Sequence, residues 1–175
     1  MKTTLNKIRE HRPCTSGWEK LLYYLGKTKA DDEPLSLLTI LDSNGIDDAI
    51  WCLRSVAGRD REIRLFAVWC ARQVQHLLKD QRSLDALDVA ERYANGEATE
   101  AELKDAWTAA SAAEAAWAAA SAAWAAYYAA RAAEAALDAA WAAWSASGAA
   151  DISRDEMRKR QADELRRICG EVEGE

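Results

Sequence analysis

Arginine and tryptophan side chains gather in one stretch of this chain, where together they could bind a flat, anionic ligand. The stretch contains Trp51, Arg54, Arg61, Arg64, Trp69 and Arg72. Arg61, Arg64 and Arg72 follow the spacing of one helix face. Guanidinium groups hold phosphate through paired hydrogen bonds, and an indole stacks on a base. The alternative is a solvated helix face whose arginines pair with Asp60, Glu62 or a neighbouring helix.

A second group of large side chains interrupts an alanine-rich stretch between residues 101 and 150. These side chains recur every third or fourth residue, which predicts a stripe along one helix. The members expected to contact a ligand or partner are Trp117, Trp124, Tyr128 and Arg131. Tryptophan and arginine dominate many binding surfaces. The stripe is therefore a ligand-binding wall, the seam of a dimer, or a packing surface against the preceding helices.

Side chains suited to catalysis or metal binding are sparse. The two histidines, His11 and His76, lie in unrelated contexts, and no two cysteines have the C-x-x-C spacing of a metal site. Asp47 and Asp48 form an acidic pair typical of a helix start, where carboxylates complement the helix dipole. The chain is therefore expected not to be an enzyme and to use neither a metal nor another cofactor.

Composition narrows the possible partners and location. The chain has 175 residues and a net charge of −6, which argues against nonspecific nucleic-acid binding. No apolar run approaches the roughly 20 residues that span a bilayer, and the start of the chain is polar, so no membrane contact is expected. Cys52, Cys70 and Cys169 fall in apolar helical patterns and are predicted to be buried, reduced thiols. These features predict a cytoplasmic protein.

Helix start and stop signals recur along the chain. Capping boxes occupy residues 16–19, 99–102 and 153–156. Further helix starts are predicted at Pro34, Asp47, Asp60 and Ser83. Gly26 and Gly96 are predicted to follow helix ends. No stretch alternates polar and β-branched residues, so no strand is expected.

The predicted fold class is all-α, with three parts that pack as one unit. Residues 1–96 form a bundle of short antiparallel helices, residues 97–150 a long alanine-rich helical segment, and residues 151–175 a C-terminal helix with an acidic tail. Neither glycine nor proline occurs between residues 99 and 147. A single helix of that length extends roughly 72 Å. We expect it to project and pair with a second copy of the chain; the alternative is a bent helix.

Several segments resemble a family of phage- and prophage-encoded immunity proteins. The resemblance is carried by residues 17–22 (GWEKLL), 32–35 (DEPL), 50–54 (IWCLR) and 60–65 (DREIRL). An alanine-rich segment dotted with Trp, Arg and Asp is also similar to that family. The resemblance implies an all-α protein, found near toxin or defence loci, that neutralises its target by binding. It also marks the pair Arg61 and Glu62 as a candidate part of the site.

The combined expectation is a non-catalytic binding protein of immunity or counter-defence type. It would sequester either a small nucleotide-type defence signal or a toxin or effector protein, at the place where the helices of residues 51–72 meet the alanine-rich stripe. The alternative is a structural protein whose long helix builds an assembly.

Overall fold

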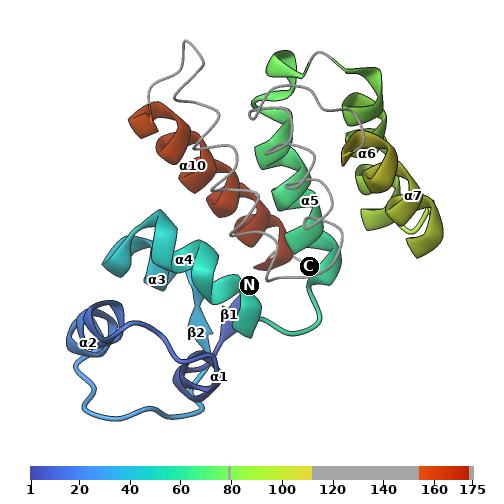
Figure 1. Cartoon of the computed structure of the whole chain (residues 1–175). Helices are drawn as coiled ribbons and strands as arrows, with labels where there is room; N and C mark the ends of the chain where they lie inside the picture. The colour runs from blue at the N-terminus through green and yellow to red at the C-terminus, as the bar shows by residue number, and fades with distance from the viewer. Residues whose placement is uncertain (79, 112–153, 174–175) are drawn as a thin grey trace.

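The fold is all-α, as predicted, with one very small sheet (Figure 1). The computed structural model describes residues 1–78, 80–111 and 154–173. Its α-helices are α1 (Leu5–Glu10), α2 (Thr15–Tyr24), α3 (Leu37–Asn44), α4 (Ile46–Cys52), α5 (Asp60–Arg72), α6 (Gln81–Ala94), α7 (Glu100–Ser111) and α10 (Arg154–Glu173). Short 3₁₀ helices span Leu53–Ser55 and Gln75–Leu77. In the described part of the chain, no helix is long and apolar enough to cross a membrane.

The prediction that the chain contains no strand is wrong at two short places. Strand β1 (Lys2–Thr3) pairs antiparallel with β2 (Leu35–Ser36). The Thr3 hydroxyl anchors β1 by donating to the Ser55 carbonyl at 2.8 Å, and the Ser55 hydroxyl donates to the Cys52 carbonyl at 2.6 Å. Two-residue strands are too short to produce an alternating pattern, and their stabilising contacts come from residues more than thirty positions away.

Pro34 does not open a helix, contrary to its predicted role. The two residues after it are extended in β2, and α3 begins only at Leu37. The Ser36 side chain caps this helix by accepting a hydrogen bond from the Leu38 backbone N–H at 3.2 Å. A serine cap and a strand partner together override the preference of proline for the first helical turn.

The capping box at residues 99–102 is confirmed, and the helix-stop glycines lie where predicted. The Thr99 hydroxyl accepts from the Glu102 N–H at 3.2 Å, and the Glu102 carboxylate accepts from the Thr99 N–H at 2.8 Å. Gly26 and Gly96 follow α2 and α6 with φ angles of 64° and 77°. Only a residue without a β-carbon adopts these left-handed conformations without strain.

Other predicted caps are displaced by a few residues. Helix α2 begins at Thr15, so Ser16 lies inside its first turn and caps nothing. Helix α6 begins at Gln81 rather than Ser83, because the Asp80 carboxylate accepts from the Arg82 N–H at 2.9 Å. Residue 153, the first of the third predicted box, lies outside the described residues.

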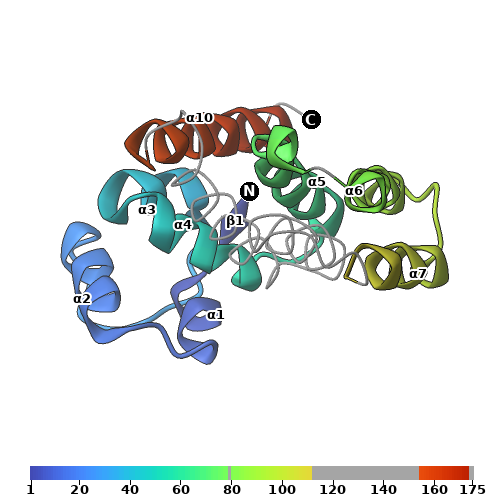
Figure 2. The same cartoon turned by 45° about the horizontal axis from the view of Figure 1, so that its top comes forward.

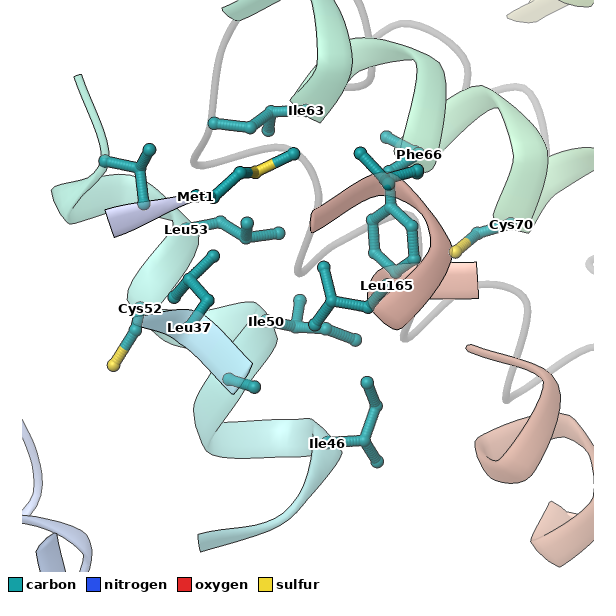
Figure 3. Packing of buried hydrophobic residues seen from close by; sticks show 14 of the residues in the cluster. Met1, Leu37, Ile46, Ile50, Cys52, Leu53, Ile63, Phe66, Cys70 and Leu165 are labelled. Carbon is teal, nitrogen blue, oxygen red and sulfur yellow. The ribbon is translucent and has the colours of Figure 1, made fainter. Parts of the chain in front are cut away.

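One hydrophobic core joins the N-terminal helices to α5 and α10. Leu53, Phe66 and Leu165 are fully buried, and Figure 3 shows them pointing into the same space from three separate segments. Helix α10 packs against α3, α4 and α5 (Figure 2). The thiols predicted to be buried, Cys52, Cys70 and Cys169, are buried. Residues far apart in the sequence therefore share a single core.

The alanine-rich segment is described over its first part alone. Helix α7 covers Glu100–Ser111 and packs beside α6 (Figure 1). Residues 112–153 lie outside the described residues. Most of the long helix predicted over residues 97–150 therefore lies outside the described residues.

Candidate functional site

A groove of about 400 Å³ lies between α5, α6 and α10, and we call it the α5–α10 groove. It is lined by Arg61, Glu62, Leu65, Val68, Trp69 and Arg72 of α5, Glu91 of α6, and Glu164, Arg167, Ile168 and Glu171 of α10. Residues 61, 65, 68 and 72 repeat at intervals of three and four, so one face of α5 supplies them. Residues 164, 168 and 171 form the opposite wall in the same way.

Four of the predicted site residues meet in this groove: Arg61, Glu62, Trp69 and Arg72. Sequence reasoning missed the wall supplied by α10. The 3–4 spacing of Glu164, Arg167, Ile168 and Glu171 marks one face of a helix, but nothing in that spacing says which helix it faces.

The floor of the groove is apolar. Val68 and Ile168 are buried, and Leu65 and Trp69 are half-buried beside them. The Trp69 ring stacks on Phe66, with 6.4 Å between ring centroids and 11° between ring planes. Phe66 belongs to the core, so stacking on it holds the Trp69 ring in position. The exposed part of the ring can therefore contact a ligand without rearranging.

Arg72 is committed to neighbours on α6. Its guanidinium donates to Asp88 at 2.7 Å and to Glu91 at 2.6 Å. Partial burial by itself lowers the pKa of Arg72, but the hydrogen bonds that it donates to Asp88 and Glu91 outweigh this effect and raise the pKa above its ordinary value. Arg72 therefore links α5 to α6 and has little capacity left for a bound anion.

Arg167 is similarly occupied, by carboxylates of its own helix. It pairs with Glu164 and with Glu171, each at 2.6 Å. These side-chain hydrogen bonds raise the pKa of Arg167. The α10 wall therefore presents a row of alternating charges.

Arg61 is the arginine of the groove that keeps its charge available. It is exposed and donates to the Asn95 side-chain oxygen at 2.8 Å. Within the described residues it forms no ion pair. Its neighbour Glu62 pairs with Arg59 at 3.2 Å. The rim of the groove therefore carries three arginines and four glutamates, with a slight excess of negative charge.

Arg64 lies outside the groove, although the sequence placed it on the face of Arg61 and Arg72. Three helical positions turn by 300°, so Arg64 points about 60° away from Arg61. Its guanidinium lies over the Tyr93 ring of α6, 5.2 Å from the ring centroid. Its Nε atom is buried and has no hydrogen-bond partner among the described residues. Arg64 therefore helps α5 pack against α6 and does not line the groove.

Trp51 and Arg54 form a separate pair at the end of α4. The Arg54 guanidinium lies 4.5 Å from the Trp51 ring centroid, and its Nε donates to the Trp51 carbonyl at 2.9 Å. Trp51 contributes to a different pocket, among the N-terminal helices. The remaining predicted residues, Trp117, Trp124, Tyr128 and Arg131, lie outside the described residues.

Across residues 1–78, 80–111 and 154–173, no group of three or more His, Cys, Asp or Glu side chains is placed to hold a metal ion. Comparison with protein-family models, with curated proteins and with solved structures finds no match to this chain. The function is therefore inferred from the chemistry of the α5–α10 groove itself.

Proposed function

We propose that this chain is a non-catalytic binding protein of immunity or counter-defence type that sequesters a toxin or effector protein in the cytoplasm. The single observation that carries the binding role is the α5–α10 groove, with an apolar floor and a rim of both charge signs. Protein interfaces combine an apolar centre with a polar rim in this way. The immunity role comes from the resemblance of residues 17–22, 32–35, 50–54 and 60–65 to that family.

The charges of the rim favour a protein partner over a nucleotide. A nucleotide phosphate needs guanidinium groups with free hydrogen-bonding capacity. Arg72 and Arg167 each already bind two carboxylates, and the four glutamates of the rim repel an anion. An amphipathic helix with apolar residues at intervals of three and four and charges on both flanks would satisfy the floor and rim together.

The proposal is tested by a photocrosslinking amino acid placed at residue 61, in the groove. The matched control is the same amino acid at Tyr23, which is 89% exposed on α2. We expect the groove position, and not the control, to crosslink one protein in cells that encode the toxin or defence system. The captured protein is then purified, and its affinity is measured with the wild type and with Leu65→Glu.

We expect Leu65→Glu to weaken the complex at least tenfold, about 1.4 kcal/mol, while the thermal unfolding midpoint stays close to that of the wild type. Equal affinity of the wild type and Leu65→Glu for the captured protein would show that the groove is not the binding surface. A crosslink confined to residues 112–153 of the same chain would overturn it as well. Tight binding of ATP, GTP or a cyclic dinucleotide that Arg61→Ala abolishes would replace the protein partner with a nucleotide.

A further inference from the structure

A second pocket, of about 130 Å³, is lined by residues of α1, α2, α3 and α4. Its walls are mostly apolar or aromatic, and they include Ile8, Leu21, Trp18 and Trp51. Cys14 is the exposed one among the described residues that line it. The volume resembles that of the engineered protein cavity of about 150 Å³ that holds one benzene. The pocket therefore fits a ligand with a short apolar body.

Among the described residues, Asp48 is the one carboxylate that lines this pocket. The Asn44 amide donates to Asp48 Oδ2 at 2.7 Å and to the Gly17 carbonyl at 2.8 Å. The hydroxyl of Ser43 lies 2.8 Å from the Asn44 side-chain oxygen and fixes the orientation of the amide. These contacts hold the Asp48 carboxylate in place and use only one of its two oxygens.

The second oxygen of Asp48, Oδ1, receives no hydrogen bond from a described residue, and no described cation pairs with the carboxylate. Two cations lie nearby, but both are directed elsewhere. Lys20 donates to the Asn44 carbonyl at 3.5 Å, and Arg54 binds Trp51. Asp48 Oδ1 therefore remains available as an acceptor for a donor group on a ligand.

Gly17 shows how closely α2 fits against this carboxylate. A β-carbon at residue 17 would lie 2.8 Å from Asp48 Oδ2 and 3.1 Å from the Cys14 sulfur. The first distance is shorter than real β-carbon contacts allow. The close approach of α2 to Asp48 therefore depends on glycine.

We propose that this pocket binds an alkylammonium or guanidinium group on a short apolar stem. The cation would donate a hydrogen bond to Asp48 Oδ1, and the stem would lie against the aliphatic walls. The indole of Trp18 would attract the cation through its π face, while Arg54 already occupies the Trp51 ring. The ligand is either a free small amine or a lysine or arginine side chain of a partner protein.

The negative charge of Asp48 acts on Cys52, another residue that lines the pocket. Burial raises the pKa of the neighbouring Cys52 thiol to about 12, and the negative charge of Asp48 contributes to this rise. A bound cation would offset that charge. An anionic ligand of the same size would add to it, so the pocket selects by charge as well as by shape.

The test measures binding of n-butylammonium by calorimetry, with 1-butanol and butyrate as neutral and anionic controls of similar size. The matched variants are Asp48→Asn and Asp47→Asn, since Asp47 is the adjacent residue of α4 but lies outside the pocket and pairs with Arg158. We expect Asp48→Asn to weaken n-butylammonium binding at least tenfold and Asp47→Asn to change it less than twofold.

Three results would overturn the proposal. They are equal affinity of the wild type and Asp48→Asn, equal affinity for 1-butanol and n-butylammonium, and no binding of n-butylammonium or n-butylguanidinium at about 10 mM, which corresponds to less than about 3 kcal/mol. A lysine derivative blocked at both backbone ends separates the two sources. If it binds at least as tightly as n-butylammonium, the occupant is a partner side chain; if it is rejected while n-butylammonium binds, the occupant is a free amine.

A measurement on the wild type covers the case in which Asp48→Asn does not fold. Cys14 is exposed, while Cys52, Cys70 and Cys169 are buried, so iodoacetamide reacts first at Cys14, which lines the pocket. We expect n-butylammonium, and not 1-butanol, to slow alkylation of Cys14 severalfold. An unchanged rate at saturating n-butylammonium would contradict the proposal. These results do not depend on the α5–α10 groove, which shares no lining residue with this pocket.

Discussion

At the scale of single residues, arginines that look alike in the sequence have different roles. Arg72 joins two helices through Asp88 and Glu91, Arg167 binds carboxylates of its own helix, and Arg64 packs on Tyr93. An ion pair that connects two elements restrains tertiary structure. A pair within one exposed helix contributes only a few tenths of a kcal/mol.

Replacing Arg72 by methionine tests this distinction. The change keeps the apolar stem and removes the charged hydrogen bonds to α6. The Arg72 side chain is 29% exposed, so solvent screening leaves an expected loss of about 1–2 kcal/mol in the free energy of unfolding. Urea denaturation measures it. Arg167→Met is the matched control, with an expected loss below about 0.5 kcal/mol, and equal losses in the two variants would contradict the assignment.

Cys52 predicts a dependence of stability on alkaline pH. Burial raises the pKa of its thiol from 9.0 to about 12, so between these values the folded chain keeps a proton that the unfolded chain releases. Stability therefore falls as pH rises above 9, by at most about 1.4 kcal/mol per pH unit from this group. Cys52→Ala should reduce the slope of unfolding free energy between pH 9 and 10.5 by the share of this group, while Cys70, whose thiol pKa is also raised by burial, continues to contribute. The exposed Cys14→Ala is the control, and a wild-type slope in Cys52→Ala would refute the prediction.

At the scale of elements, hydrogen bonds at helix ends decide where the helices begin. The side chains of Thr99 and Glu102 bond reciprocally at the start of α7, whereas Ser16 lies within the first turn of α2 without capping it. Both positions carry the same sequence signature, so only the observed bonds separate them.

Thr99→Ala is expected to cost about 1 kcal/mol, because it leaves a helix N–H without its acceptor. Ser16→Ala is expected to leave the free energy of unfolding unchanged or to raise it by a few tenths of a kcal/mol, since alanine is a better helix former than serine and no cap is lost. Chemical denaturation compares the two free energies, and hydrogen exchange of residues 100–104 locates the effect. A larger loss in Ser16→Ala than in Thr99→Ala would show that the capping assignment is reversed.

At the scale of the whole molecule, the core makes distant parts of the chain depend on one another. Leu165 of α10 is fully buried in the same cluster as Leu53 and Phe66, more than ninety residues earlier. Helix α10 is therefore expected to unfold together with α4 and α5, not as an independent tail.

Leu165→Ala should lower the free energy of unfolding by about 2–5 kcal/mol through lost burial and a residual cavity. Hydrogen exchange should show reduced protection in α4 and α5 as well as in α10. Lys159→Ala, an exposed position of the same helix, is the control and should leave the protection unchanged. Loss of protection confined to α10 would mean that α10 is not an integral part of the core.

The sequence by itself determined the features that depend on neighbouring residues. It predicted the all-α class, the helix stops at Gly26 and Gly96, the capping box at residues 99–102 and the burial of Cys52, Cys70 and Cys169. It also placed Arg61 and Arg72 on one helix face, because the helical repeat sets which positions share a face whatever the rest of the fold does, but it placed Arg64 on that face as well, and Arg64 lies outside the groove. Each of these features is fixed within about one turn or one helix.

The tertiary structure alone decided the features that need contacts between distant segments. Strand β1 pairs with β2, α10 forms one wall of the groove, and Asp48 is held by Asn44 beneath Gly17. It also set the charge available in the groove, since the partners of Arg72 lie on α6, sixteen and nineteen residues away. A sequence pattern states which face a helix presents. Which surface meets that face follows from how all the helices bury their apolar area at once.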